Sequence, residues 1–256
     1  MKNSLEMTMR DLRLSGARET LRLRLQEASA NGLSHEEFLE ILLEDEKAIR
    51  KQRKLQRMVK QADFKDLKTI EDFDFSFNSS IDRTLMYDLA AGHFIREAKD
   101  VLMIGPPGTG KSHMAQALGY SAIKQKFTVY YRSIFDLVRD FSREEKGIEP
   151  ERILNKYLKA ELLIIDDMGI KQLGERGSEY LFEVILRRHE KRSTIMTSNR
   201  PVEEWGKLLN DVPAATAILD RFMQTANIIP FKGRSYRLKD KTVMQPEKVD
   251  KLNEAN

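Results

Sequence analysis

The chain has 256 residues, of which 41% are hydrophobic, so it has room for one large domain and a smaller one. Its 44 Lys and Arg against 40 Asp and Glu give a net charge of +4, which only hints at a polyanionic partner. The absence of cysteine excludes a disulfide framework, thiol catalysis and zinc–thiolate sites, and it fits a reducing compartment. No apolar run reaches the roughly 18 residues of a membrane span, and the first residues lack the apolar core of a signal peptide. We therefore expect a cytoplasmic protein without a membrane partner.

The first 68 residues are predicted to form a small all-helical domain that binds DNA or a partner protein. Apolar residues such as Leu21 and Ala28 recur at helical spacing along this segment. Ser34 stands three residues before Glu37, which is the spacing of a capping box, so a helix is expected to begin after Ser34.

The segment 47–60 holds seven basic residues and no acidic one. On a helix these residues fall within about half of the circumference, and Ala48, Leu55 and Val59 lie on the opposite side, where they can pack. Such a face can bind DNA phosphates, but a run of charge is also typical of a solvated helix, and acidic residues 44–46 can partly neutralise it. The candidate DNA-binding residues are Lys47, Arg50, Lys51, Arg53, Lys54, Arg57 and Lys60.

Residues 69–80 carry alternating aromatic side chains without a helical period, which predicts an extended linker that packs on the next domain. From residue 81 to residue 240, short apolar or β-branched runs alternate with helical stretches. This alternation is typical of a parallel sheet with helices on both faces, so the fold class is α/β. The polar tail, residues 241–256, is predicted to be flexible. The five expected strands are Val101–Ile104, Thr128–Tyr131, Leu162–Ile165, Thr194–Thr197 and Ile228–Phe231.

The stretch from Gly105 to Ser112 matches the pattern G-x-x-x-x-G-K-[ST] between a predicted strand and a predicted helix. Its glycines let backbone N–H groups surround phosphate oxygens, and the positive end of the following helix points at the same oxygens. Lys111 can reach the β- and γ-phosphates, and Ser112 can ligate Mg²⁺. A glycine-rich turn without a ligand is the alternative, which the flanking strand and helix disfavour. The candidate nucleotide-binding residues are Gly105, Pro106, Pro107, Gly108, Thr109, Gly110, Lys111, Ser112 and His113.

Two carboxylates follow the buried strand that begins near Glu161. Asp166 and Asp167 would lie at the carboxyl end of that strand, where open α/β sheets bind ligands. With Ser112, Asp166 is expected to hold the metal through its water shell, and Asp167 is expected to orient and polarise the attacking water. A strand that ends in a solvated acidic turn would look the same by itself, but the phosphate-binding pattern makes that interpretation unattractive.

The run from Thr194 to Pro201 is a further strand that ends in polar residues. If it lies beside the strand that carries Asp166, then Asn199 or Ser198 would sit near the γ-phosphate, where an amide can hold the lytic water. An asparagine that caps the next turn is the alternative.

Arg221 lies at the end of the helical run Ala217–Phe222, well past these strands. In a protein that stacks on copies of itself, such an arginine can reach the γ-phosphate of a neighbouring subunit. A surface arginine paired with Asp220 is the alternative, and the sequence alone favours it.

Taken in this order, the four elements resemble the AAA+ ATPases of the initiator clade. Within that clade the chain resembles the IstB-like transposition helper ATPases of insertion sequences, and the helicase loader DnaC and the initiator DnaA look like more distant relatives. The resemblance covers nearly the whole chain. It is closest at Gly105–Ser112, Leu163–Gly169, Tyr180–Ile185, Thr197–Asn199, Glu204–Gly206, Ala217–Phe222 and Ser235–Arg237, with the segments Ser34–Leu39 and Ile70–Phe75 pointing to IstB-like proteins rather than helicase loaders.

The resemblance assigns a role to each candidate catalytic residue. Lys111 grips the triphosphate, Asp166 and Asp167 form the Walker B pair, Asn199 is sensor I, and Arg221 is a finger that acts on a neighbouring subunit. Relatives often have glutamate where this chain has Asp167, so slow hydrolysis is expected. Only 35 residues follow Arg221, too few for a full C-terminal helical lid, and a sensor II arginine is either missing or replaced by one of two others. These two are Arg234 and Arg237.

The implied function is that of an ATP- and Mg²⁺-dependent homo-oligomer in a bacterial cytoplasm. It would assemble on duplex DNA with little regard to base sequence and recruit a cognate transposase. A DnaC-like helicase loader and a DNA-binding scaffold without hydrolysis remain alternatives. A small-molecule kinase is a further alternative from another class, but the sequence shows no sign of an acceptor pocket or a closing lid.

Overall fold

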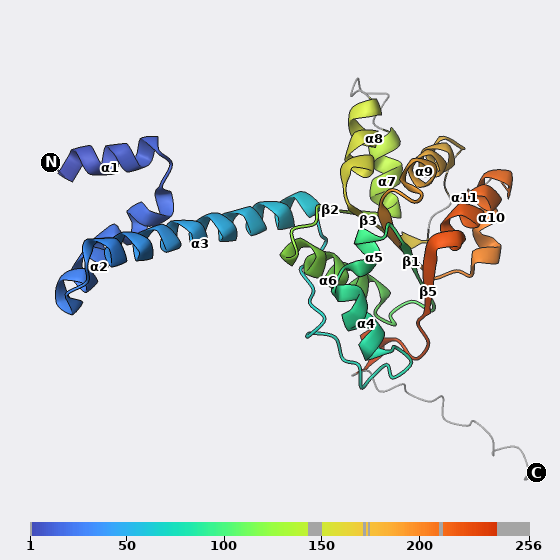
Figure 1. Ribbon diagram of the computed structural model, residues 1–256. Coiled ribbons are helices and arrows are strands. Elements are labelled where there is room, and N and C mark those ends of the chain that lie inside the picture. Colours follow the sequence, from blue (N-terminus) through green and yellow to red (C-terminus); the bar gives the residue numbers. More distant parts are fainter. Residues whose placement is uncertain (1, 143–149, 171–172, 174, 210–211, 240–256) are drawn as a thin grey trace, which may run out of the picture.

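The computed structural model describes residues 2–142, 150–170, 173, 175–209 and 212–239, so the tail predicted to be flexible lies outside the described residues. A lobe of helices stands away from an α/β domain, and one long helix joins the two (Figure 1). None of the helices within these ranges is long and apolar enough to cross a membrane.

The N-terminal lobe consists of three helices around a small apolar core. The third helix begins with the predicted capping box, because the Ser34 hydroxyl accepts from the backbone N–H of Glu37 at 3.2 Å and the Glu37 carboxylate accepts from the N–H of Ser34 at 2.8 Å. The core residues are Met9, Ala17, Leu21 and Leu42. The helices are α1 (Lys2–Asp11), α2 (Ser15–Asn31) and α3 (His35–Ala62).

A buried carboxylate joins α2 to α3. Glu46 of α3 is 4% exposed, and its Oε2 accepts from the backbone N–H groups of Gly16 and Ala17 at 2.6 and 3.0 Å. Its other oxygen accepts from Arg50 at 2.5 Å. Burial alone would raise the pKa of Glu46, but these donors outweigh burial and lower the pKa. The carboxylate thus satisfies free N–H groups in the first turn of α2.

Replacing Glu46 with alanine is expected to destabilise the lobe by about 1–3 kcal/mol, because two buried N–H groups lose their acceptor. The pKa of Glu46 is lower in the folded chain than the ordinary value for glutamate. Its contribution to stability is therefore fully present above the ordinary pKa and is lost as the pH falls through the pKa of the folded chain. Hydrogen–deuterium exchange of α2 from pH 7 to pH 3 measures it. Equal exchange of α2 in the wild type and in Glu46→Ala at pH 7 would show that the Glu46 carboxylate adds no stability.

The α/β domain contains a five-stranded sheet in the order β2-β3-β4-β1-β5, in which every neighbouring pair is parallel. All five predicted strands are present, which confirms the α/β fold with a five-stranded parallel sheet. The strands are β1 (Asp100–Ile104), β2 (Val129–Ser133), β3 (Leu162–Met168), β4 (Ser193–Ser198) and β5 (Ala226–Pro230).

Helices cover both faces of the sheet, because successive strand residues point to opposite sides. In β3, Leu163 and Ile165 enter one core with residues of α7, α8, α9 and α11. Leu162 and Ile164 enter the other core with residues of α4, α5 and α6. The remaining helices are α4 (Arg83–Ala90), α5 (His93–Arg96), α6 (Lys111–Lys124), α7 (Ile134–Ser142), α8 (Pro150–Lys159), α9 (Glu175–Arg188), α10 (Trp205–Leu209) and α11 (Val212–Thr225), with 3₁₀ turns η2 (Val202–Glu204) and η3 (Tyr236–Leu238).

The C-terminal half of α3 packs against β2 and α6. Leu55 and Val59 are half-buried against the second core, as expected, and Ala62 is fully buried. The expectation for Ala48 is wrong, because this residue is exposed. Its neighbour Ile49 faces α2 instead. The packing of α2 decides which side of this part of α3 is covered, and the pattern of basic residues does not.

Candidate nucleotide-binding site

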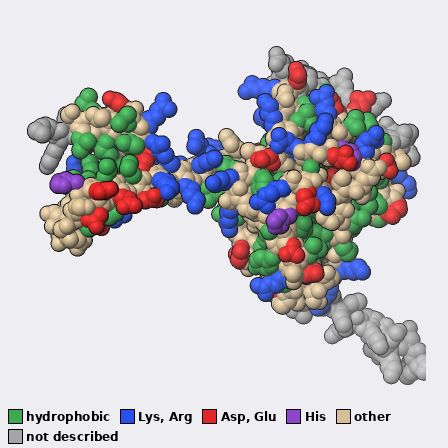
Figure 2. Space-filling model, in the orientation of Figure 1, with side chains coloured by type: hydrophobic (Ala, Val, Ile, Leu, Met, Phe, Trp, Pro, Cys, Tyr) green, Lys and Arg blue, Asp and Glu red, His purple; other side chains and the backbone are tan. Residues whose placement is uncertain are grey.

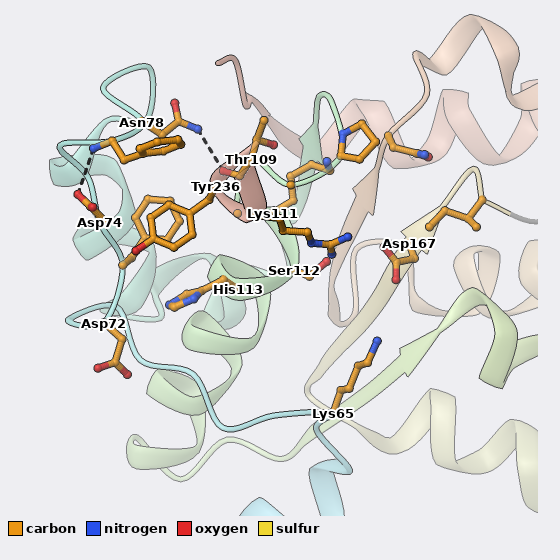
Figure 3. Close-up of a pocket in the computed structure, with 18 residues that line it drawn as sticks. Lys65, Asp72, Asp74, Asn78, Thr109, Lys111, Ser112, His113, Asp167 and Tyr236 are labelled. Atoms are coloured by element: carbon orange, nitrogen blue, oxygen red, sulfur yellow. Dashed lines mark hydrogen bonds between the residues drawn. The ribbon is translucent and has the colours of Figure 1, made fainter. Parts of the chain in front are cut away.

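A cavity of about 410 Å³ opens at the carboxyl ends of the sheet strands, where open α/β sheets bind ligands (Figure 3). Its walls come from four parts of the chain that are far apart in sequence. They are residues 65–78, the loop and helix start at 107–113, the ends of β3 and β4 near Asp167 and Asn199, and the C-terminal pair Tyr236 and Arg237.

Two glycines of the phosphate-binding pattern are required by close approach of the backbone. A Cβ added to Gly105 would lie 1.9 Å from the carbonyl oxygen of Phe231, and one added to Gly108 would lie 2.0 Å from the hydroxyl of Ser235. Gly108 also has a φ of 79°. The loop is therefore held between β1 and the chain that follows β5.

Of the candidate nucleotide-binding residues, those from Pro107 to His113 line the cavity, whereas Gly105 and Pro106 do not. Lys111 is 7% exposed, and its ammonium donates to the carbonyl oxygens of Gly105 and Pro106 at 2.7 Å each. Burial lowers the pKa of Lys111, while Asp166 and Asp167 oppose that shift. Gly105 and Pro106 thus position the side chain of Lys111, which the rest of the loop surrounds.

Asp166 is 1% exposed and is held by donors from three elements. Its Oδ1 accepts from Ser112 at 2.9 Å and from Thr197, and its Oδ2 accepts from the Tyr131 hydroxyl at 2.6 Å. Burial, followed by Asp166, raises the pKa of Tyr131, so this hydroxyl keeps its proton and donates. The sequence pattern does not identify Tyr131 or Thr197 as site residues, because their contacts depend on the order of the strands.

The Ser112–Asp166 pair fits a magnesium ion. It offers a hydroxyl and a carboxylate oxygen, which are ligands that Mg²⁺ accepts beside phosphate oxygens and water. Within the described ranges, no group of three or more His, Cys, Asp or Glu side chains could hold a metal. The donor set therefore suits a cation that a bound triphosphate helps to hold.

Asp167 lines the cavity directly beyond Asp166. Its φ is 63°, and the pairing of β3 with β4 is irregular between Ile165 and Met168, so the strand bends where the carboxylate emerges. Burial first, and then the charge of Asp166, raise the pKa of Asp167, while Lys65, Arg237 and Lys111 lower it. The site thus holds a half-buried carboxylate whose proton affinity exceeds that of an ordinary aspartate.

Asn199 follows β4 and lines the same cavity. Its Oδ1 is buried and has no hydrogen-bond partner among the described residues. Ser198 is fully buried and its hydroxyl donates to the carbonyl oxygen of Arg200, so of the two candidates only Asn199 faces the cavity. The Asn199 side chain nevertheless lines the cavity, where its amide group can bind a water molecule.

The candidate arginines are placed apart. Arg221 lies on α11, outside the cavity, where its guanidinium approaches the carbonyl oxygen of Ala217 at 3.5 Å. Arg237 lines the cavity, whereas Arg234 is exposed and does not. Of these three candidates, Arg237 is the one that lines the cavity of its own subunit.

The end of the cavity far from Asp167 is built by the linker and the C-terminal segment (Figure 3). The rings of Phe77 and Tyr236 meet edge to face, with centroids 5.1 Å apart. Asn78 donates to the carbonyl oxygen of Thr109 at 3.1 Å, and Lys239 pairs with Asp74 at 2.8 Å. The alternating aromatic residues predict a linker that packs on the domain, but no pattern in the sequence assigns any of them to the site.

A protein-family model described as "IstB-like ATP binding protein" matches residues 7–244. The chain belongs to this family. It is 37% identical over 223 residues to a protein of Geobacillus stearothermophilus that is named as an ATP-binding protein of the insertion sequence IS5376, with 87% of this chain and 89% of that one covered. The family is thus one of ATP-binding proteins associated with insertion sequences.

Solved structures agree on the fold. The DnaC helicase loader is 19% identical with a TM-score of 0.50, and the match covers 58% of this chain and 87% of that one. The initiator DnaA from Aquifex aeolicus is 23% identical with a TM-score of 0.54, and the match covers 69% of this chain and 54% of that one. The α/β domain therefore has the AAA+ fold predicted from its motifs.

Proposed function

We propose that this IstB family member binds ATP with Mg²⁺ and hydrolyses it within a homo-oligomer that assembles on duplex DNA and recruits the transposase of its insertion sequence. The main support is the arrangement of five residues around one cavity. Lys111, the Ser112–Asp166 pair, Asp167 and Asn199 meet at one end of a single cavity, so the groups that grip a triphosphate stand beside groups that can direct water at it.

Each of these residues has a distinct task. Loop N–H groups and Lys111 bind phosphate oxygens, and Ser112 and Asp166 hold Mg²⁺, which neutralises charge on the phosphates when it is bound. Asn199 positions the attacking water, and Asp167 accepts its proton. The raised pKa of Asp167 suits this task, because a base works best when its pKa approaches the operating pH.

Replacing Asp167 with asparagine should leave ATP affinity within a few-fold of the wild type and lower turnover roughly 100-fold or more, because an amide cannot accept the proton. Fluorescent-nucleotide titration and phosphate release measure the two quantities. Asp88→Asn, the same change at an exposed position of α4, serves as the control. Wild-type turnover in Asp167→Asn would place the base elsewhere. If the wild type itself showed no turnover with DNA present, a non-hydrolysing scaffold would be the better description.

The basic face of α3 supports the DNA part of the proposal (Figure 2). The structure divides its seven candidate residues into two groups. Three already have acidic partners, since Lys47 pairs with Glu44, Arg50 with Glu46, and Arg53 with Glu19. The other four are exposed and show no ion pair with any residue that the structure describes: Lys51, Lys54, Arg57 and Lys60. We therefore place the DNA contact on these four.

The double variant Lys54→Glu with Arg57→Glu should weaken duplex binding and flatten its dependence on salt, because each lost phosphate contact lowers the slope of log affinity against log salt by about 0.9. Binding should remain insensitive to base sequence, since phosphate contacts carry no sequence information. Fluorescence anisotropy at several salt concentrations measures this. The control is the double variant Lys99→Glu with Lys126→Glu, which makes the same change of charge on the α/β domain. An equal loss in that control would indicate a general charge effect and not a contact made by α3.

The transposition role is favoured over helicase loading by the relatives. The similar sequences that cover most of this chain carry insertion-sequence names. The likeness to DnaC lies at 19% identity and bears on the fold alone. Capture of the transposase encoded by the same insertion sequence on immobilised DNA, with ATP and not with ADP, is the expected result, and capture of a replicative helicase instead would favour the alternative.

A further inference from the structure

Lys65 lies three residues beyond the end of α3 and lines the nucleotide cavity. Its side chain points toward the end of the cavity that holds Ser112 and Asp167 (Figure 3). The residue is exposed, and the described part of the chain offers its ammonium no hydrogen bond or ion pair. A lysine aimed into a cavity without a partner is available to a ligand.

The backbone on both sides of Lys65 is anchored. Phe64 packs against the ring of Tyr131 with centroids 6.0 Å apart, and it also contacts α6 so closely that a Cβ on Gly119 would lie 2.9 Å from its ring. On the other side, the N–H of Asp66 donates to Gln116 at 3.0 Å. The position of Lys65 in the cavity wall is therefore set by the fold.

The residues that anchor Asp66 and Phe64 also contact the groups that would hold the phosphates. Gln116 is 4% exposed and also donates to the carbonyl oxygen of Ser112 at 3.1 Å. Tyr131, against which Phe64 packs, donates to Asp166. The end of α3 itself is fixed by Asp63, whose carboxylate accepts from Arg132 at 2.5 Å. A few contacts thus connect the groups that would hold the phosphates with the end of α3.

The Lys65 side chain lies at the end of the cavity where the terminal phosphate would be held. It faces Ser112 and Asp167, whereas Asn78 and Tyr236 lie at the opposite end (Figure 3). A γ-phosphate bound by Lys111 would therefore lie in the part of the cavity that Lys65 also lines.

We propose that Lys65 binds the γ-phosphate of ATP from the end of α3, and thereby ties the N-terminal lobe to the nucleotide state. This inference rests on the proposed function, because it needs ATP in the cavity. ADP lacks the γ-phosphate, so the contact forms with the triphosphate alone. The consequence is that ATP adds one further contact between the end of α3 and the α/β domain, and hydrolysis removes it.

The test compares affinities for a slowly hydrolysed ATP analogue and for ADP, each with Mg²⁺, by isothermal titration calorimetry on the full chain. Lys65→Ala should lose roughly ten-fold or more in affinity for the analogue, as expected for a charged hydrogen bond, and bind ADP within two-fold of the wild type. Lys65→Arg should retain most of the preference for the analogue. Lys68→Ala removes a lysine of the same segment that does not line the cavity, and it should match the wild type.

Hydrogen–deuterium exchange provides the second readout. The analogue, and not ADP, should slow exchange at residues 63–68 of the wild type, and this difference should vanish in Lys65→Ala. If Lys65→Ala keeps the wild-type ratio of analogue to ADP affinity, the inference is wrong while the proposed function stands. A wild-type chain that binds neither nucleotide would overturn the proposed function and this inference with it.

Discussion

Replacing Lys111 with alanine is expected to lower the affinity for ATP roughly 100-fold or more, because at least two charge-assisted bonds of about 1.5–3 kcal/mol each are lost. Lys111 is 7% exposed, and its ammonium already donates to the carbonyl oxygens of Gly105 and Pro106. Its geometry is therefore prepared before the phosphates arrive. Titration with a fluorescent ATP analogue measures the loss, and both ATP and ADP should be affected, in contrast to Lys65→Ala.

The control for this variant is Lys124→Ala, which removes an exposed cation from the other end of the same helix. A thermal melt must accompany the titration, because the loss of Lys111 leaves two carbonyl groups without their donor. If Lys111→Ala is folded and binds ATP like the wild type, the cavity is not the triphosphate site.

Replacing Arg221 with alanine should leave ATP binding by an isolated subunit unchanged and lower turnover in assemblies by roughly 10³–10⁵-fold, the range known for arginine fingers. The guanidinium lies outside the cavity of its own subunit. With the residues that the structure describes it makes one long hydrogen bond, to the carbonyl oxygen of Ala217 in its own helix. It can therefore act on a neighbour. Phosphate release at rising protein concentration, with DNA present, measures the effect.

A mixing experiment separates action on a neighbour from action within the subunit. Arg221→Ala has an intact nucleotide site but no finger, whereas Lys111→Ala has the finger but no nucleotide. Mixed assemblies should regain part of the wild-type turnover, because each variant supplies what the other lacks at a shared interface. Arg187→Ala, an exposed arginine of α9, is the control. A mixture that co-assembles without any rescue would contradict the action of Arg221 on a neighbouring subunit.

The features predicted correctly from the sequence depend on neighbours along the chain. Each strand of the sheet is a short apolar run, and the pattern from Gly105 to Ser112 needs only local spacing to mark a phosphate-binding loop. The capping box at Ser34 is equally local, since its two hydrogen bonds span three residues.

The features that were missed depend on contacts between distant segments. Tyr131 reaches Asp166 because β2 lies beside β3, an order that no pattern in β2 reveals. The pairing of Arg53 with Glu19 requires the packing of α2 on α3, so the helical wheel showed a wider free basic face than exists. Lys65 was counted only as part of the predicted helical domain, residues 1–68, because its place in the cavity follows from the anchored neighbours Phe64 and Asp66.

The C-terminal segment that closes the nucleotide cavity also sets when the site can form during synthesis. Ser235 and Tyr236 pack on the loop at Gly108, and Lys239 pairs with Asp74 of the linker, so the last wall is made by residues translated long after the loop. Chains emerge from the ribosome from the N-terminus, and contacts between distant segments form late in folding. A nascent chain released up to β4 therefore has the phosphate loop and both carboxylates but lacks the wall built by Tyr236 and Arg237. We therefore expect complete nucleotide binding only in chains that have been translated past Arg237.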